Sequence, residues 1–162
     1  MAPWIENNYP LEEGPITYTH RNLSNDNYEF KLNEDNVIKM DRIDEISKII
    51  TNSYAFEILD GRPVDRFNGV VPEPRPGVRS GNILGSKNVF FKDLVNEDWT
   101  YKSDEELKKI FQNAKVNLES DIVTSCGSGL TAAMINLSLT LIGKEQMKLY
   151  DGAWTEYGSR PE

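Results

Sequence analysis

The chain has 162 residues, of which 38% are hydrophobic and 10% aromatic, and it carries a net charge of −8. This composition is typical of a globular protein with a buried core, and it argues against a disordered chain. The acidic charge argues against nucleic acid or an anionic membrane as a partner, because both attract basic surfaces. No apolar run approaches the roughly 20 residues of a membrane-spanning helix.

The cysteine and histidine counts limit redox and metal chemistry. The single cysteine cannot form an internal disulfide, which favours a reducing compartment, the cytoplasm or the mitochondrion. The single histidine, His20, cannot build a metal site alone, so we expect an exposed loop residue there and neither metal nor cofactor. Residues 1–6 show no basic and apolar leader, so we expect no signal peptide.

The first 26 residues are mostly polar and contain three prolines and a glycine, which predicts an extended linker. Trp4 and Tyr9 are unusual in a linker, and they indicate a segment that packs either against this domain or against another one. Residues 27–162 are then expected to form one domain.

Helical and strand patterns alternate through that domain. Apolar periodicity predicts helices at 40–50, 103–114 and 130–142, and strands at 28–32, 56–60, 88–91, 121–125 and 148–150. Ser103 and Glu106 fit a capping box at the start of the second helix. The alternation predicts an α/β fold with a largely parallel central sheet flanked by helices. Ligands of such sheets bind beyond the carboxyl ends of the strands.

A long loop at 61–86 is rich in proline and glycine and carries four arginines, at positions 62, 66, 75 and 79. A loop of this length inside a compact domain is uncommon and often functional. The alternative is a solvated loop with scattered charges. Asp60 and Cys126 both lie at predicted carboxyl ends of strands, so this loop and the cysteine loop can converge there.

Cys126 lies between a predicted buried strand and a predicted helix, in a short loop that contains Gly127 and Gly129. Glycines allow successive backbone N–H groups to turn inward around an anion. The start of the following helix adds a favourable dipole, worth about 0.3–1 kcal/mol. Both features would stabilise a thiolate, which is the nucleophilic form of cysteine. The alternative is a cysteine that only fills the core.

Six motifs occur in the order found in rhodanese-family sulfurtransferases. They are Asp-Gly-Arg at 60–62, Arg-Phe-Asn-Gly at 66–69, Pro-Glu-Pro-Arg at 72–75, Ser-Gly-Asn-Ile-Leu-Gly-Ser at 80–86, Cys-Gly-Ser-Gly-Leu-Thr-Ala at 126–132 and Tyr-Asp-Gly-Ala-Trp at 150–154. From about residue 40 to its end, the chain resembles the catalytic, C-terminal domain of the two-domain members. The resemblance implies a rhodanese-like fold.

The cysteine loop resembles that of the members that use 3-mercaptopyruvate, because Gly127 and Ser128 stand where thiosulfate-using members usually have basic residues. The resemblance implies that Arg66 and Arg75 bind the substrate carboxylate and keto group, since an arginine fork suits a planar carboxylate. It also implies that Ser128 helps to move a proton and that a persulfide on Cys126 is cradled by backbone amides. The implied cradle consists of Gly127, Ser128, Gly129, Leu130 and Thr131. Asp60 and Arg62 match the family, and either a structural role or a substrate contact fits them.

The implied reaction moves the sulfur of 3-mercaptopyruvate onto Cys126, releases pyruvate, and passes the sulfur to a thiol or thioredoxin-like acceptor. Residues 3–12 resemble the tail of the family's first domain, so residues 1–26 are expected to be the linker and tail of a missing or vestigial first rhodanese domain. That domain would be a further partner. The alternatives are a thiosulfate sulfurtransferase and a regulatory domain that carries a persulfide without turnover. A cysteine-based phosphatase is disfavoured, because the loop has no arginine to surround a phosphate.

Overall fold

The computed structural model describes residues 5–11, 13–15, 33–50 and 55–161. The chain divides into two units, Met1–Asn33 and Glu34–Glu162, and the second unit contains every element described below. His20, the strand predicted at 28–32 and the boundary predicted at 26–27 lie outside the described residues. The assignment of residues 1–26 to a vestigial first domain therefore stays a prediction.

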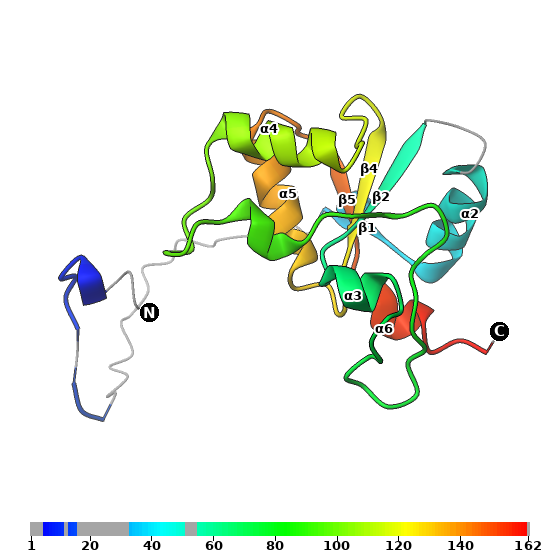
Figure 1. The fold of residues 1–162 in the computed structure, drawn as a ribbon, viewed down its shortest axis with the longest axis horizontal. Helices are drawn as coiled ribbons and strands as arrows, with labels where there is room; N and C mark the ends of the chain where they lie inside the picture. The colour runs from blue at the N-terminus through cyan, green and yellow to red at the C-terminus, as the bar shows by residue number, and fades with distance from the viewer. Residues whose placement is uncertain (1–4, 12, 16–32, 51–54, 162) are drawn as a thin grey trace, which may run out of the picture. The chain divides into compact units, whose positions relative to one another are not determined.

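A five-stranded sheet forms the centre of the second unit (Figure 1), with the strand order β1-β5-β4-β2-β3. Its strands are β1 (Val37–Ile38), β2 (Phe56–Asp60), β3 (Lys87–Asn88), β4 (Asp121–Ser125) and β5 (Met147–Tyr150). All neighbouring strands pair in parallel, which confirms the predicted α/β class. The last four residues of β4 are buried, as expected for a parallel strand that is covered on both faces.

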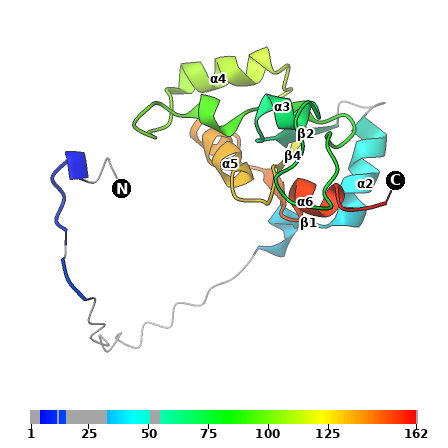
Figure 2. The same cartoon turned by 60° about the horizontal axis from the view of Figure 1, so that its bottom comes forward.

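Helices cover both faces of the sheet. In both views α2 (Met40–Ile50) and α6 (Ala153–Tyr157) gather on one side, and α4 (Asp104–Asn113) and α5 (Ala132–Leu141) on the other (Figure 1 and Figure 2). Side chains of successive strand residues point to opposite faces. Ile58 of β2 therefore joins the core beneath α2 and α6, whereas its neighbour Leu59 joins the core beneath α4 and α5.

The structure differs from the prediction in several places. Strand β1 was not predicted, and β5 begins one residue earlier than expected. The predicted strand at 88–91 is wrong beyond Asn88, where β3 ends. Its neighbour β2 ends at Asp60, so after Asn88 the chain makes only two more backbone hydrogen bonds to this strand, from Val89 to Asp60 and from Phe91 to Gly61. It then enters the 3-10 helix η2 (Phe91–Leu94). The loop at 61–86 contains a short helix, α3 (Val64–Phe67), which begins after Pro63 with its fixed φ of −52°. Helix α5 begins at Ala132, two residues later than predicted, since the cysteine loop continues to Thr131.

The remaining helical predictions are confirmed. Helix α2 has the predicted bounds, and α4 begins at the predicted capping box of Ser103 and Glu106. A 3-10 helix, η1 (Glu34–Asn36), precedes β1. The helices among the described residues all fall short of the length and apolarity that a bilayer crossing requires.

The strand order places a topological switch point between β2 and β4. These strands are neighbours, yet the chain leaves β2 towards β3 on one side and leaves β4 towards β5 on the other. Asp60 and Ser125 are register partners at the two carboxyl ends, and the N–H of Gly61 donates to the carbonyl of Ser125 at 2.9 Å. The loop at 61–86, called the arginine loop below, and the cysteine loop therefore start side by side. They lie in the crevice where open α/β sheets bind ligands.

Candidate active site

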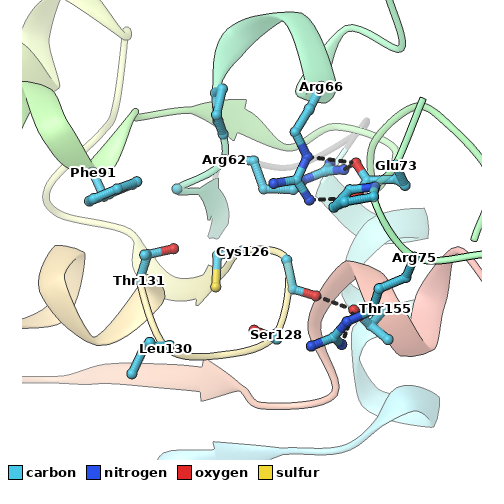
Figure 3. Close-up of a pocket in the computed structure, with 14 residues that line it drawn as sticks. Arg62, Arg66, Glu73, Arg75, Phe91, Cys126, Ser128, Leu130, Thr131 and Thr155 are labelled. Carbon is cyan, nitrogen blue, oxygen red and sulfur yellow. Dashed lines mark hydrogen bonds and ion pairs between the residues drawn. The ribbon is translucent and has the colours of Figure 1, made fainter. Parts of the chain in front are cut away.

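A cavity of about 230 Å³ lies at the carboxyl ends of β2 and β4 (Figure 3). All the site residues predicted from the sequence line it, except Gly129 and Asp60. Glu73, Phe91 and Thr155 also line it, although they were not predicted. Glu73 lies inside the Pro-Glu-Pro-Arg motif and Thr155 directly follows the Tyr-Asp-Gly-Ala-Trp motif, so these motifs were the signals that could have found them.

Cys126 follows β4 directly and is only 2% exposed. Its side chain nevertheless borders the cavity and points into it, as Figure 3 shows. The thiol is therefore shielded from bulk water but open to a small molecule in the cavity. This arrangement favours a cysteine that can react over the alternative in which it only fills the core.

The cysteine loop has backbone N–H groups that donate to no backbone carbonyl of the described residues. Within the part of the chain that the structure describes, no N–H from Gly127 to Thr131 donates to a backbone carbonyl. Gly129 adopts a φ of +86°, and a Cβ at this position would lie 3.1 Å from the carbonyl oxygen of Asp151, so both the turn and the close approach require glycine. Successive N–H groups of this kind, ahead of a helix start, form an anion-binding concavity.

Helix α6 forms hydrogen bonds with the cysteine loop. The N–H of Trp154 donates to the carbonyl of Cys126 at 2.9 Å, and the N–H of Thr155 donates to that of Gly127 at 3.0 Å. The hydroxyl of Thr155 donates to the same carbonyl of Gly127. The loop is thus fixed by backbone hydrogen bonds to a helix more than 25 residues further along the chain.

The position of α6 is itself anchored by Tyr150 at the end of β5. Its hydroxyl donates to Glu156 Oε2 at 2.7 Å and lies 3.3 Å from the sulfur of Met40. Burial and the hydrogen bond to Glu156 raise the pKa of Tyr150, so the hydroxyl stays protonated and remains a donor. This bond ties the helix that holds the cysteine loop to the central sheet.

Arg62 and Asp60 form the buried floor of the arginine loop. The guanidinium of Arg62 contacts Asp60 Oδ2 at 2.8 Å and 3.0 Å, Glu73 Oε1 at 2.8 Å and the carbonyl of Gly81 at 2.8 Å. It also lies 4.7 Å from the ring centre of Trp154. With its guanidinium engaged in this way and only 1% of its side chain exposed, Arg62 has a geometry that favours the structural role over a substrate contact.

Arg66 and Arg75 differ in their partners. Arg66 pairs with Glu73, whose carboxylate is 4% exposed and bridges Arg66 and Arg62. Arg75 is exposed and donates to the neutral hydroxyl of Thr155 at 2.8 Å, and among the described residues it has no carboxylate partner. Three guanidinium groups therefore face two carboxylates, those of Asp60 and Glu73, which leaves one positive charge in excess at the wall.

Known proteins resemble this chain in sequence and in fold. A family model described as a rhodanese-like domain matches residues 42–160. The 3-mercaptopyruvate sulfurtransferase of Escherichia coli K12 is 36% identical over 162 residues, which are the whole of this chain and 54% of that protein. Rat thiosulfate sulfurtransferase is 42% identical over 109 residues, 67% of this chain and 37% of that protein.

The crystal structure of SseA from Escherichia coli, described as a 3-mercaptopyruvate sulfotransferase, matches with a TM-score of 0.74 at 35% identity. The match covers 95% of this chain and 53% of that one. The chain thus spans about half the length, or less, of the relatives that it matches.

Proposed function

The chain belongs to the rhodanese-like domain family, and on that premise we propose that it transfers the sulfur of 3-mercaptopyruvate, through a persulfide on Cys126, to a thiol acceptor. The observation that carries this proposal is a nucleophile and an uncompensated guanidinium group, Cys126 and Arg75, in one cavity. The substrate has the matching groups, a carboxylate for the arginine and a thiol for the cysteine.

The reaction needs a thiolate at Cys126. The thiolate attacks the sulfur of 3-mercaptopyruvate, a sulfur–sulfur bond forms, and the carbon–sulfur bond breaks. The electron pair of the broken bond passes to the carbon, giving the enolate of pyruvate, which takes up a proton and leaves. Ser128 lies exposed at the rim of the cavity, where its hydroxyl can relay this proton from water.

The persulfide left on Cys126 is an anion after loss of its proton. The free N–H groups from Gly127 to Thr131 suit a charge of this kind, because fixed dipoles need no rearrangement when the charge develops. An acceptor thiolate then attacks the outer sulfur, carries it away as a new persulfide, and regenerates the thiolate of Cys126. A small thiol or a thioredoxin-like protein supplies this acceptor, and a first rhodanese domain is the further partner that we propose. We place the reaction in a reducing compartment, the cytoplasm or the mitochondrion.

The test is pyruvate release from 3-mercaptopyruvate in the presence of a small thiol, with and without an added first domain. The wild-type chain should release pyruvate, and its intact mass without acceptor should increase by one sulfur atom. Cys126→Ser should abolish both signals, because serine is a much weaker nucleophile at neutral pH. Pyruvate release that persists in Cys126→Ser would contradict the proposal. Release that stops at one equivalent per chain despite acceptor would instead identify a domain that only carries the persulfide.

Thiosulfate is the second candidate donor, and the similarity to the rat thiosulfate sulfurtransferase favours it. Thiosulfate is a dianion, however, whereas the cavity wall offers one excess positive charge and the neutral residues Gly127 and Ser128 beside the thiol. We therefore expect the larger kcat/KM for 3-mercaptopyruvate. A larger kcat/KM for thiosulfate would reverse the choice of donor.

A further inference from the structure

Thr155 joins the exposed arginine of the cavity to the cysteine loop. Its hydroxyl accepts a hydrogen bond from Arg75 Nη1 at 2.8 Å and donates its own proton to the carbonyl of Gly127. Figure 3 shows this chain of contacts along the wall of the cavity that holds Cys126. Through these two hydrogen bonds the side chain touches the group that faces an anionic substrate and the loop that carries the nucleophile.

The chemistry of the two partners explains why a hydroxyl stands between them. A guanidinium group only donates hydrogen bonds, and a backbone carbonyl only accepts them. A hydroxyl oxygen accepts and donates at once, so its proton is committed to Gly127 and its lone pairs face Arg75. A methyl group in its place would remove the hydrogen bond to Arg75 and would leave the carbonyl of Gly127 with the N–H of Thr155 as its donor.

The contacts have a consequence for each partner. The long side chain of Arg75 is exposed and loses freedom when it binds a substrate, and a bond that holds it beforehand lowers that entropic cost. The carbonyl of Gly127 receives both the N–H and the hydroxyl of Thr155. Because the peptide unit is planar and trans, the N–H of Ser128 must then point away from α6.

We propose that Thr155 is a positioning residue, which holds the guanidinium of Arg75 at a fixed place relative to Cys126 so that a carboxylate is recognised beside the sulfur. As a statement about 3-mercaptopyruvate this inference rests on the proposed function. As a statement about the cavity it can be tested without turnover.

The test uses the single cysteine of the chain as its own reporter. Iodoacetate and iodoacetamide both alkylate a thiolate, but only iodoacetate carries a carboxylate. The ratio of their second-order rate constants with the full chain, divided by the same ratio for free glutathione, measures how strongly the cavity favours an anion beside Cys126. Thr155→Val should lower this normalised ratio about fivefold, the effect of a typical hydrogen bond.

Two further variants separate positioning from a general structural effect. Thr155→Ser keeps the hydroxyl and should restore the normalised ratio to within about twofold of wild type. Thr140→Val is the matched control, because the Thr140 hydroxyl also donates to a backbone carbonyl, that of Asn136 at 3.0 Å, but lies on the exposed surface of α5. It should leave the ratio unchanged.

A coupling measurement completes the test. Arg75→Gln should lower the ratio by itself, and adding Thr155→Val to it should cause little further loss, since the two residues act as one unit. A ratio that Thr155→Val leaves unchanged, or that Thr140→Val lowers equally, would overturn the inference. So would a wild-type ratio no higher than that of glutathione.

The kinetic readout with 3-mercaptopyruvate distinguishes this inference from the proposed function. Thr155→Val should raise KM about fivefold with a smaller change in kcat, and Thr155→Ser should reverse the rise. A wild-type chain that releases no pyruvate would contradict the proposed function, while the alkylation ratio still decides the role of Thr155. An unchanged KM and an unchanged alkylation ratio in an active Thr155→Val variant would contradict the positioning role alone.

Discussion

Different kinds of side chain pack against the two faces of the central sheet. The hydrophobic cluster beneath α4 and α5 has mostly aliphatic buried members, which are Leu59, Val89, Leu94, Leu107, Phe111, Val116, Ile122, Ile135 and Leu139. The buried hydroxyl of Thr124 also donates to Asn136 of α5 on this face. The core beneath α2 and α6 also contains Tyr150, Trp154 and Tyr157, with arginine guanidinium groups against their rings. The guanidinium groups of Arg62 and Arg79 lie 4.7 Å and 5.0 Å from the ring centre of Trp154.

This difference shows which face positions the cavity. Burial of apolar surface stabilises the fold without fixing directions. Hydrogen bonds, ion pairs and cation–π contacts depend on geometry, so they fix where a side chain points. Trp154 belongs to the core beneath α2 and α6, and its backbone N–H donates to the carbonyl of Cys126. We therefore expect damage to the α4/α5 face to reduce stability alone, and damage to the α2/α6 face to change the cavity as well.

The largest expected effect is a loss of stability on the apolar face. Phe111 is fully buried in α4, so Phe111→Ala should lower the free energy of unfolding by about 3–5 kcal/mol, measured by urea denaturation. The iodoacetate-to-iodoacetamide ratio of the folded protein should stay at the wild-type value. Leu137→Ala, at a site in α5 that is 48% exposed, is the control and should cost far less. A changed alkylation ratio in folded Phe111→Ala would contradict the proposed difference between the two faces.

Arg62→Met should affect both properties. It leaves the buried Asp60 without its cation and Glu73 with Arg66 as its remaining cationic partner, which should cost about 3–5 kcal/mol of unfolding free energy. It also removes one positive charge from the cavity wall, so the alkylation ratio should fall. Adding Asp60→Asn to this variant neutralises one abandoned carboxylate and should recover part of both losses. A cost below about 1 kcal/mol would show that this network does not hold the α2/α6 face together.

The elements that the sequence predicted well are those whose pattern is local. Helix α2 and strands β2 and β4 carry their apolar spacing within a few residues, and the capping box of α4 spans only four. The end of β3 was missed because it depends on where β2 stops, which is a property of a different segment. Two-residue strands also carry too little pattern to define their own ends.

The candidate site was predicted in part for the same reason. Motifs located Cys126, Arg66 and Arg75, and the structure brings all three to one cavity. The N–H and the hydroxyl of Thr155 both donate to the backbone carbonyl of Gly127, 28 positions away, and contacts to a backbone atom leave no pattern in its segment. The buried state of Arg62 likewise depends on Glu73 and Trp154 arriving from other parts of the chain.

Glu73→Gln should change the preference between donors by about tenfold, a difference of roughly 1.4 kcal/mol. The glutamine keeps the shape of the side chain but removes the charge that compensates Arg62 and Arg66. The wall then offers two excess positive charges, which favours the dianion thiosulfate over 3-mercaptopyruvate. The ratio of the two kcat/KM values measures this shift. Asp65→Asn removes a carboxylate that is exposed to solvent, and it should change the ratio less than twofold. An equal shift in both variants would point to overall charge rather than to Glu73.

The smallest expected effect lies at the start of α4, a helix that packs on the apolar face of the sheet. The residues concerned are exposed at the protein surface. Ser103 caps this helix by accepting from the N–H of Glu106, so Ser103→Ala should lower the free energy of unfolding by about 1 kcal/mol near neutral pH. Hydrogen bonds from Ser103 also lower the pKa of Glu106. A carboxyl group whose pKa is lower in the folded than in the unfolded protein stabilises the fold at pH values above its unfolded pKa. This stabilisation is lost as the pH falls through the folded pKa. The difference between wild type and Ser103→Ala should therefore shrink in acid, whereas Ser103→Thr should behave as wild type. The alkylation ratio should not move in either variant, because Ser103 and Glu106 are exposed and do not line the cavity.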